Sequence, residues 1–133
     1  MPVVGLRGDL LPAWADRVRE FALSNPVAFE QSLEREAPGE IIEELDAVLA
    51  RDPECWTALA ARARCLVRLA DAAEPAERKG LLTDALTSAQ RAVELWECAE
   101  TWRAVSEAAS ALGNGRLARQ ATALAERWER KGR

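Results

Sequence analysis

The sequence predicts an all-α protein in which about seven helices form a single domain. Apolar residues recur with helical spacing along nearly the whole chain, and no segment alternates apolar and polar residues as a half-buried strand would. Prolines and glycines separate the periodic stretches, so neighbouring helices have short connections and should run antiparallel, as a chain of hairpins. The chain has 133 residues, of which 49% are hydrophobic, so it can bury one core without disulfides.

The first half of the chain predicts three helices. Residues 9–24 start with Asp9 as a helix cap and carry one apolar stripe, made of Leu11, Trp14, Val18 and Phe21. Asn25-Pro26 opens a short second helix, which Pro38-Gly39 breaks. Residues 40–53 place their apolar side chains on one face of a third helix, which ends at Pro53.

The second half predicts four longer helices with alanine-rich inner faces. They are expected over residues 53–72, 75–95, 99–112 and 115–130. Two stretches in this half repeat each other, since residues 53–60 (PECWTALA) align with residues 99–106 (AETWRAVS). In each stretch a tryptophan precedes an aliphatic residue by three positions, so both lie on one helix face. The helix that follows each stretch carries small residues at matching spacing.

These residues resemble the tetratricopeptide repeat (TPR), a helical hairpin of roughly 34 residues with a large residue early in its first helix and alanines in its second. Trp102 and Ala118 stand 16 residues apart, as in that family, and Gly113 falls where its inter-helix glycine sits. Trp56 and Trp102 are 46 residues apart, so the first unit carries about a dozen extra residues around Pro75. The resemblance implies a short right-handed solenoid of stacked hairpins.

The resemblance also implies a division of the chain, treated as one TPR-like domain. Residues 1–24 are expected to form an N-terminal helix, and residues 25–53 a possible degenerate repeat. Residues 53–97 correspond to a first repeat with an extended hairpin, and residues 98–131 to a second repeat with a C-terminal cap. The extra residues of the first repeat should lengthen both of its helices and make a protruding arm.

In the TPR family, the first helices of successive hairpins line a concave groove that binds a peptide or helix of a partner protein. The positions that the resemblance places in this groove are Glu54, Thr57, Ala61, Arg64 and Cys65 in the first repeat, and Glu100, Arg103, Glu107, Ser110 and Ala111 in the second. Arg68 lies one helical turn after Arg64, so both can face the groove and pair with acidic groups of a ligand. The alternative is that these arginines pair with Glu100 and Glu107, or face water.

The residues 113–118 have the spacing G-x-G-x-x-A of a dinucleotide-binding loop. Such a loop follows a strand, whereas the residues before Gly113, "SEAASAL", form a helical pattern. Gly113 is therefore expected to end one helix in the left-handed conformation, and Gly115 to lead into the next. The segment predicts a turn between helices and no phosphate site.

Composition argues against an enzyme and against a bound cofactor or metal. The chain has no histidine, and its three cysteines form no C-x-x-C pair and have no visible activating base. The glutamates at 43–44 and at 34 and 36 are too close in sequence to share a helix face, so no acid/base pair is implied. The sequence thus favours a non-enzymatic adaptor, scaffold or chaperone-like module whose partner is another protein.

Charge is divided unevenly along the chain. Residues 1–54 carry five basic and twelve acidic side chains, whereas residues 55–133 carry thirteen basic and ten acidic ones. The alternative function is therefore a homo-oligomer, assembled head to tail through an acidic N-terminal and a basic C-terminal surface. The net charge of −4 disfavours nucleic acid as a partner. No long apolar run or signal peptide is apparent, so no membrane association and a cytoplasmic location are expected.

Overall fold

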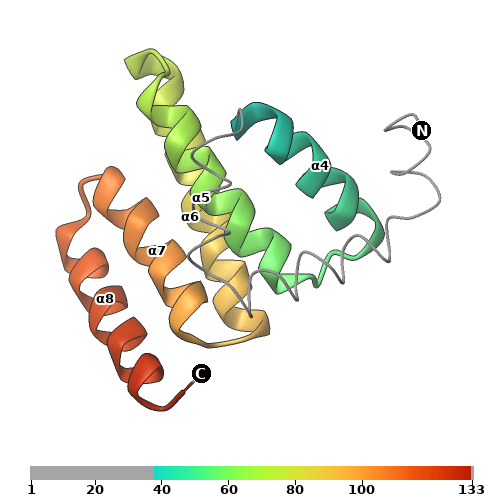
Figure 1. Ribbon diagram of the computed structural model, residues 1–133. Helices are drawn as coiled ribbons and strands as arrows, with labels where there is room; N and C mark the ends of the chain where they lie inside the picture. The colour runs from blue at the N-terminus through green and yellow to red at the C-terminus, as the bar shows by residue number, and fades with distance from the viewer. Residues whose placement is uncertain (1–37, 133) are drawn as a thin grey trace.

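The computed structural model describes residues 38–132, and these residues form α-helices joined by short turns, with no strand among them. The described helices are α4 (Pro38–Arg51), α5 (Trp56–Asp71), α6 (Pro75–Leu95), α7 (Ala99–Ala111) and α8 (Gly115–Arg130) (Figure 1). This confirms the all-α prediction. The two helices expected before residue 38 lie outside the described residues.

Two helix starts differ from the sequence prediction. Helix α4 begins at Pro38, which was expected to break the preceding helix, because the first position of a helix needs no backbone N–H donor. Helix α5 begins at Trp56, so the predicted start at Pro53 or Glu54 is wrong. Asp52 holds these residues in a turn, since its carbonyl accepts from the Cys55 N–H (3.2 Å) and its carboxylate from the Glu54 N–H (3.2 Å).

The helices pack as successive antiparallel hairpins. Helices α5 and α6 form one hairpin, helices α7 and α8 form the next, and α4 packs against α5. The two hairpins meet through α5 and α6, which both contact α7. Across the view of Figure 1, α4, α5, α7 and α8 lie side by side, while α6 lies behind.

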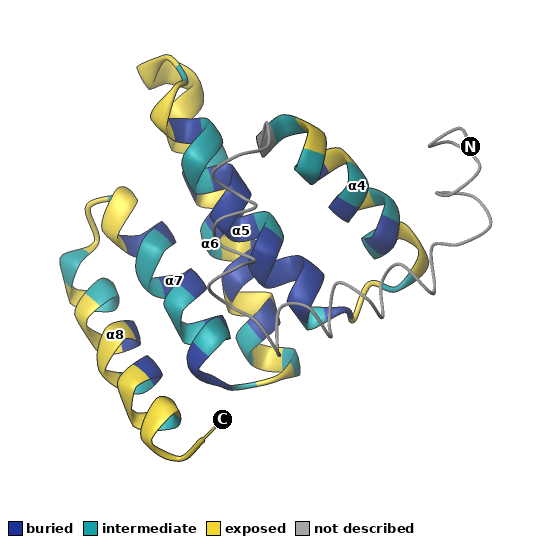
Figure 2. Cartoon of the chain, viewed as in Figure 1, coloured by how far each residue is buried: buried dark blue, intermediate teal, exposed yellow. Residues whose placement is uncertain are grey.

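The core is built largely from alanine. Ten alanines of the core cluster, on four helices, are almost completely buried: Ala58, Ala60, Ala61, Ala63, Ala85, Ala89, Ala92, Ala104, Ala108 and Ala121 (Figure 2). Small side chains let helix axes approach closely while the interior stays dense. Larger apolar side chains such as Leu45, Val48 and Val105 fill the space that remains. Trp56 and Trp102 are only partly buried and pack against the edge of this core.

The connection between α7 and α8 is a turn, as the sequence predicted. Gly113 has a φ of 82°, in the left-handed region. The Asn114 N–H donates to the Ala109 carbonyl (2.9 Å) and the Gly113 N–H to the Ser110 carbonyl (3.0 Å), the pair of bonds that closes a helix in a Schellman motif. The Asn114 side chain then caps α8 by accepting from the Leu117 N–H (3.2 Å).

The α5–α6 hairpin is longer than the α7–α8 hairpin. Helices α5 and α6 have 16 and 21 residues, whereas α7 and α8 have 13 and 16. The tip of the long hairpin, residues 71–80, is exposed almost throughout and extends beyond α7 (Figure 2). Arg78 of α6 closes the tip by donating to the carbonyls of Ala70 (3.0 Å) and Ala73 (3.2 Å) at the end of α5.

Candidate functional site

A charged cluster joins the first helices of the two hairpins. The Arg64 guanidinium on α5 lies 2.8 Å from the Glu107 carboxylate on α7 and 3.9 Å from the Glu100 carboxylate. Arg68, one turn later on α5, lies 3.7 Å from Glu107. Only 6% of the Arg64 side chain is exposed, so its charge depends on these carboxylates rather than on water.

The cluster matches the alternative reading of the arginines, in which they pair within the chain. Thr57, Ala61 and Cys65, which the sequence also placed in the groove, are buried as well. The Thr57 hydroxyl lies 3.4 Å from the Cys55 sulfur. Most of the predicted groove positions on α5 therefore offer little surface to a partner.

The remaining predicted positions are more accessible, but they do not gather in one place. Glu54 is exposed in the turn before α5, whereas Arg68 is partly exposed in the last turn of that helix. Fourteen residues at 1.5 Å each separate these two positions by roughly 20 Å. Arg103 pairs with Glu129 of α8, and Ser110 is exposed near the end of α7.

Ser110 belongs to an open groove between α7 and α8, which we call the α7–α8 groove. Its volume is about 330 Å³, and its lining consists of Ser106, Ser110, Ala118, Arg119, Thr122, Ala123 and Glu126. The Ser106 and Thr122 hydroxyls lie 2.7 Å apart, and Thr122 also donates to the Ala118 carbonyl (2.9 Å). The lining is thus made mostly of small residues, several of them with hydroxyl groups, together with an arginine and a glutamate.

The sequence located only one of the groove's residues, Ser110. The α8 side was missed because its small residues, Ala118 and Thr122, were interpreted only as the repeat's packing positions. They do pack near α7, but their small size also leaves the space that forms the groove. The available signal was the run of small residues along α8, interrupted by charged ones.

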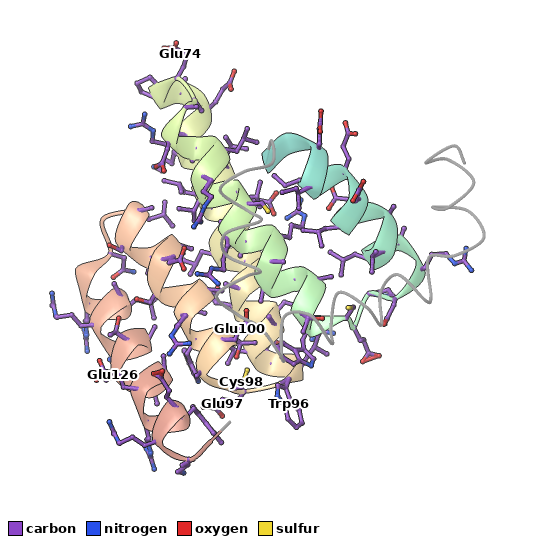
Figure 3. The ribbon with its side chains drawn as sticks, viewed as in Figure 1. Glu74, Trp96, Glu97, Cys98, Glu100 and Glu126 are labelled. Carbon is purple, nitrogen blue, oxygen red and sulfur yellow. The ribbon has the colours of Figure 1, made fainter. Side chains whose placement is uncertain are left out.

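A second feature that the sequence analysis missed is a cluster of tryptophans around Glu97. Glu97 lies in the connection between α6 and α7, where Figure 3 labels it. One oxygen of the Glu97 carboxylate accepts from the indole N–H of Trp102 (2.9 Å) and from that of Trp128 (3.0 Å). The Lys131 ammonium lies 5.0 Å from the centre of the Trp128 ring, in cation–π geometry. Nearby in sequence, Trp96 stacks on Trp56.

Arg62 connects three helices and has a structural role. It donates to Asp46 of α4 (2.6 Å), to both oxygens of Asp84 on α6 (2.8 and 3.0 Å) and to the Ser88 hydroxyl (2.8 Å). The hydrogen bonds to Asp84 raise the pKa of Arg62 above its ordinary value, and those to Asp46 add to the effect. Arg62 therefore holds the α5–α6 hairpin against α4.

Within residues 38–132, no three His, Cys, Asp or Glu side chains are grouped so that they could hold a metal ion. The three cysteines, all within the described residues, form no disulfide there and are buried. None of the described helices has both the length and the apolar character that crossing a membrane requires.

Comparisons of the chain with protein-family models, with curated proteins and with solved structures find no match.

Proposed function

We propose that the chain is a TPR-like, non-enzymatic adaptor that binds a segment of another protein. The observation that carries the proposal is the order of the helix contacts. Two successive hairpins pack so that their first helices, α5 and α7, are neighbours, and α7 also contacts the second helix of the preceding hairpin. Repeats stacked in this way form extended surfaces suited to binding peptides.

The α7–α8 groove is the surface that we assign to the partner. It is open, and its hydroxyl groups and its two oppositely charged side chains can bind the polar groups of a peptide or of a helix. Arg103 and Glu129, also on α7 and α8, add a further charged pair. Arg68 and Glu107 contribute a partly exposed charged edge on the neighbouring helices.

Site-specific photo-crosslinking tests this assignment. A photoreactive amino acid is placed at Ser110 or Ala123 in the groove and, as a matched control, at Gln90, which is exposed on α6. In host lysate, both groove positions should form covalent adducts with one protein, and the adducts should map to one contiguous segment of it. Equal labelling from Gln90, or labelling spread over unrelated proteins, would contradict the proposal.

The charges of the outer helices favour a second candidate function, head-to-tail self-assembly. Helix α4 carries Glu40, Glu43, Glu44 and Asp46 against Arg51, whereas α8 carries four arginines against two glutamates. Light scattering across a salt series tests it, because association through these charges should weaken as salt rises. A monomer at low salt would remove this candidate.

We also propose a cytoplasmic location. The three cysteines form no disulfide in the described part of the chain, which suits a reducing compartment. Fractionation of host cells, followed by detection of the protein, tests this part of the proposal. Recovery with a membrane or secreted fraction would contradict it.

A further inference from the structure

Trp96 and Trp56 form a rigid aromatic surface at one end of the hairpins, which we call the aromatic platform. Their ring centres lie 6.3 Å apart, and their planes are inclined by 22°. Trp96 is 40% exposed and is the only large hydrophobic residue in the described part of the chain with that degree of exposure. Exposed tryptophans on a fixed scaffold are the residue type most often found to dominate binding energy at interfaces.

The backbone on both sides of the Trp96 ring is fixed. The Trp96 N–H donates to the Ala92 carbonyl (2.9 Å), and the Trp96 carbonyl accepts from the Thr101 hydroxyl (3.0 Å). Trp56 supports the ring through the stacking contact. Because the side chain is already ordered, a ligand that contacts it loses little conformational freedom in the protein.

The charged residues close in sequence to the two platform tryptophans are predominantly acidic. Exposed carboxylates stand two positions before each tryptophan, at Glu54 and Glu94. A basic side chain stands five positions before each tryptophan, at Arg51 and Arg91. Arg91 lies 3.4 Å from Glu94 in an exposed pair that contributes little. An aromatic face bordered by carboxylates attracts cations through the ring quadrupole and through charge.

The chain itself contains an example of this chemistry. At the neighbouring tryptophan, Lys131 lies over the Trp128 ring while Glu97 binds that ring's N–H. A cation, an indole and a carboxylate are thus combined within one site. The platform offers the same two partners, an indole and nearby carboxylates, at the surface.

We propose that the aromatic platform binds a basic segment of a partner protein, with an arginine stacked on Trp96 and its charge balanced by Glu54 and Glu94. Arginine fits better than lysine because its planar guanidinium stacks on an aromatic ring. The inference goes beyond the proposed function, since none of the platform residues lines the α7–α8 groove. A failed groove assignment would leave it unaffected.

The probe is a fluorescein-labelled decapeptide of alternating glycine and arginine, and binding to the full chain is followed by fluorescence anisotropy at low salt. Trp96→Ala should weaken binding about tenfold, as expected for losing a desolvated cation–π contact. Glu54→Gln/Glu94→Gln should weaken it about fivefold without disturbing the fold, because both side chains are exposed. A matched peptide with glutamate in place of arginine should show no binding.

The effect of overall charge on peptide affinity must be distinguished from that of the aromatic platform, because any cationic peptide is attracted to an acidic protein. Glu40→Gln/Glu43→Gln removes the same charge from exposed positions on α4 and should change affinity less than about twofold. Amide NMR spectra locate the site directly, because the Trp96 indole signal should shift as the arginine peptide is added. The proposal would be overturned if the two pairs of glutamine substitutions reduced peptide affinity equally, or if the Trp96 indole signal did not move. It would also be overturned if the unaltered chain did not bind the arginine peptide.

Discussion

The Arg64 guanidinium on α5 and the Glu107 carboxylate on α7 lie 2.8 Å apart, and the arginine side chain is almost fully buried. The pair joins the first helices of two successive hairpins. Breaking such a pair from one side leaves a buried charge without compensation, whereas replacing both partners with apolar residues is often neutral. The burial of this ion pair therefore predicts a large change in the free energy of unfolding when one partner is removed, which would not be expected for a surface pair.

Glu107→Ala should lower the free energy of unfolding by about 2–3 kcal/mol, somewhat less than a full buried-pair break because Glu100 also lies near Arg64. Arg64→Met/Glu107→Leu should restore stability to within about 1 kcal/mol of the unaltered chain. Urea denaturation of the single and double variants measures both values. If the double variant is as unstable as the sum of the single ones, the pair is not coupled.

Arg62→Ala should destabilise the fold by about 1–2 kcal/mol, because it removes charge-assisted hydrogen bonds to Asp46 and Asp84, whose side chains are about half exposed. Arg62→Lys should recover less than half of this loss, since an ammonium cannot bind both Asp84 oxygens as the planar guanidinium does. Thermal melting of the two variants gives the comparison. Full recovery with lysine would show that charge alone matters.

The raised pKa of Arg62 predicts how the contribution of this residue to stability depends on pH. Folding raises the pKa of Arg62. Its contribution to the free energy of unfolding is therefore complete below the pKa of the unfolded state, and it is lost only as pH rises through the higher pKa of the folded state. Both lie far above neutrality. The difference in stability between the unaltered chain and Arg62→Ala should thus stay constant from about pH 7 to pH 9. A decline across that window would assign the effect to another group.

Trp102→Ala should lower stability by about 2–4 kcal/mol, toward the lower part of the range for large aromatic truncations because the side chain is only partly buried. Trp102→Phe should cost about 1 kcal/mol, since it keeps most of the packing and loses the N–H that binds Glu97. Chemical denaturation monitored by circular dichroism measures both. An unfolding midpoint unchanged in Trp102→Ala would place this residue outside the packed structure.

The sequence predicted the presence of the five described helices because the evidence for a helix is local. Apolar spacing gave α6 and α8 their bounds, and the helical residues before Gly113 identified the turn correctly. Contacts between helices are not local, and they determine which residues of the candidate site are exposed and which are paired within the chain. Whether Arg64 faces a ligand or Glu107 depends on how α5 and α7 approach each other, and no spacing within either helix specifies that.

The start of α5 and the tryptophan cluster were missed for a related reason. Pro53 is a good first residue of a helix, but the Asp52 turn competes for the same backbone groups and prevails. Glu97 lies in a connection, where helical periodicity carries no information. Its role becomes visible only when Trp102 and Trp128, 26 residues apart in sequence, are brought to the same carboxylate.

Two glycine substitutions should have opposite effects on stability. Gly80 lies inside α6 with open space where a Cβ would stand, so Gly80→Ala should raise stability by about 0.5–1 kcal/mol through helix propensity. Gly113 has equally open surroundings but a φ of 82°, so Gly113→Ala should lower stability by about 1–2 kcal/mol through backbone strain alone. Gly113→Asn should cost less, because asparagine tolerates the left-handed region better. Urea denaturation of the three variants measures these differences, and a stabilising Gly113→Ala would mean that the turn is not left-handed in solution.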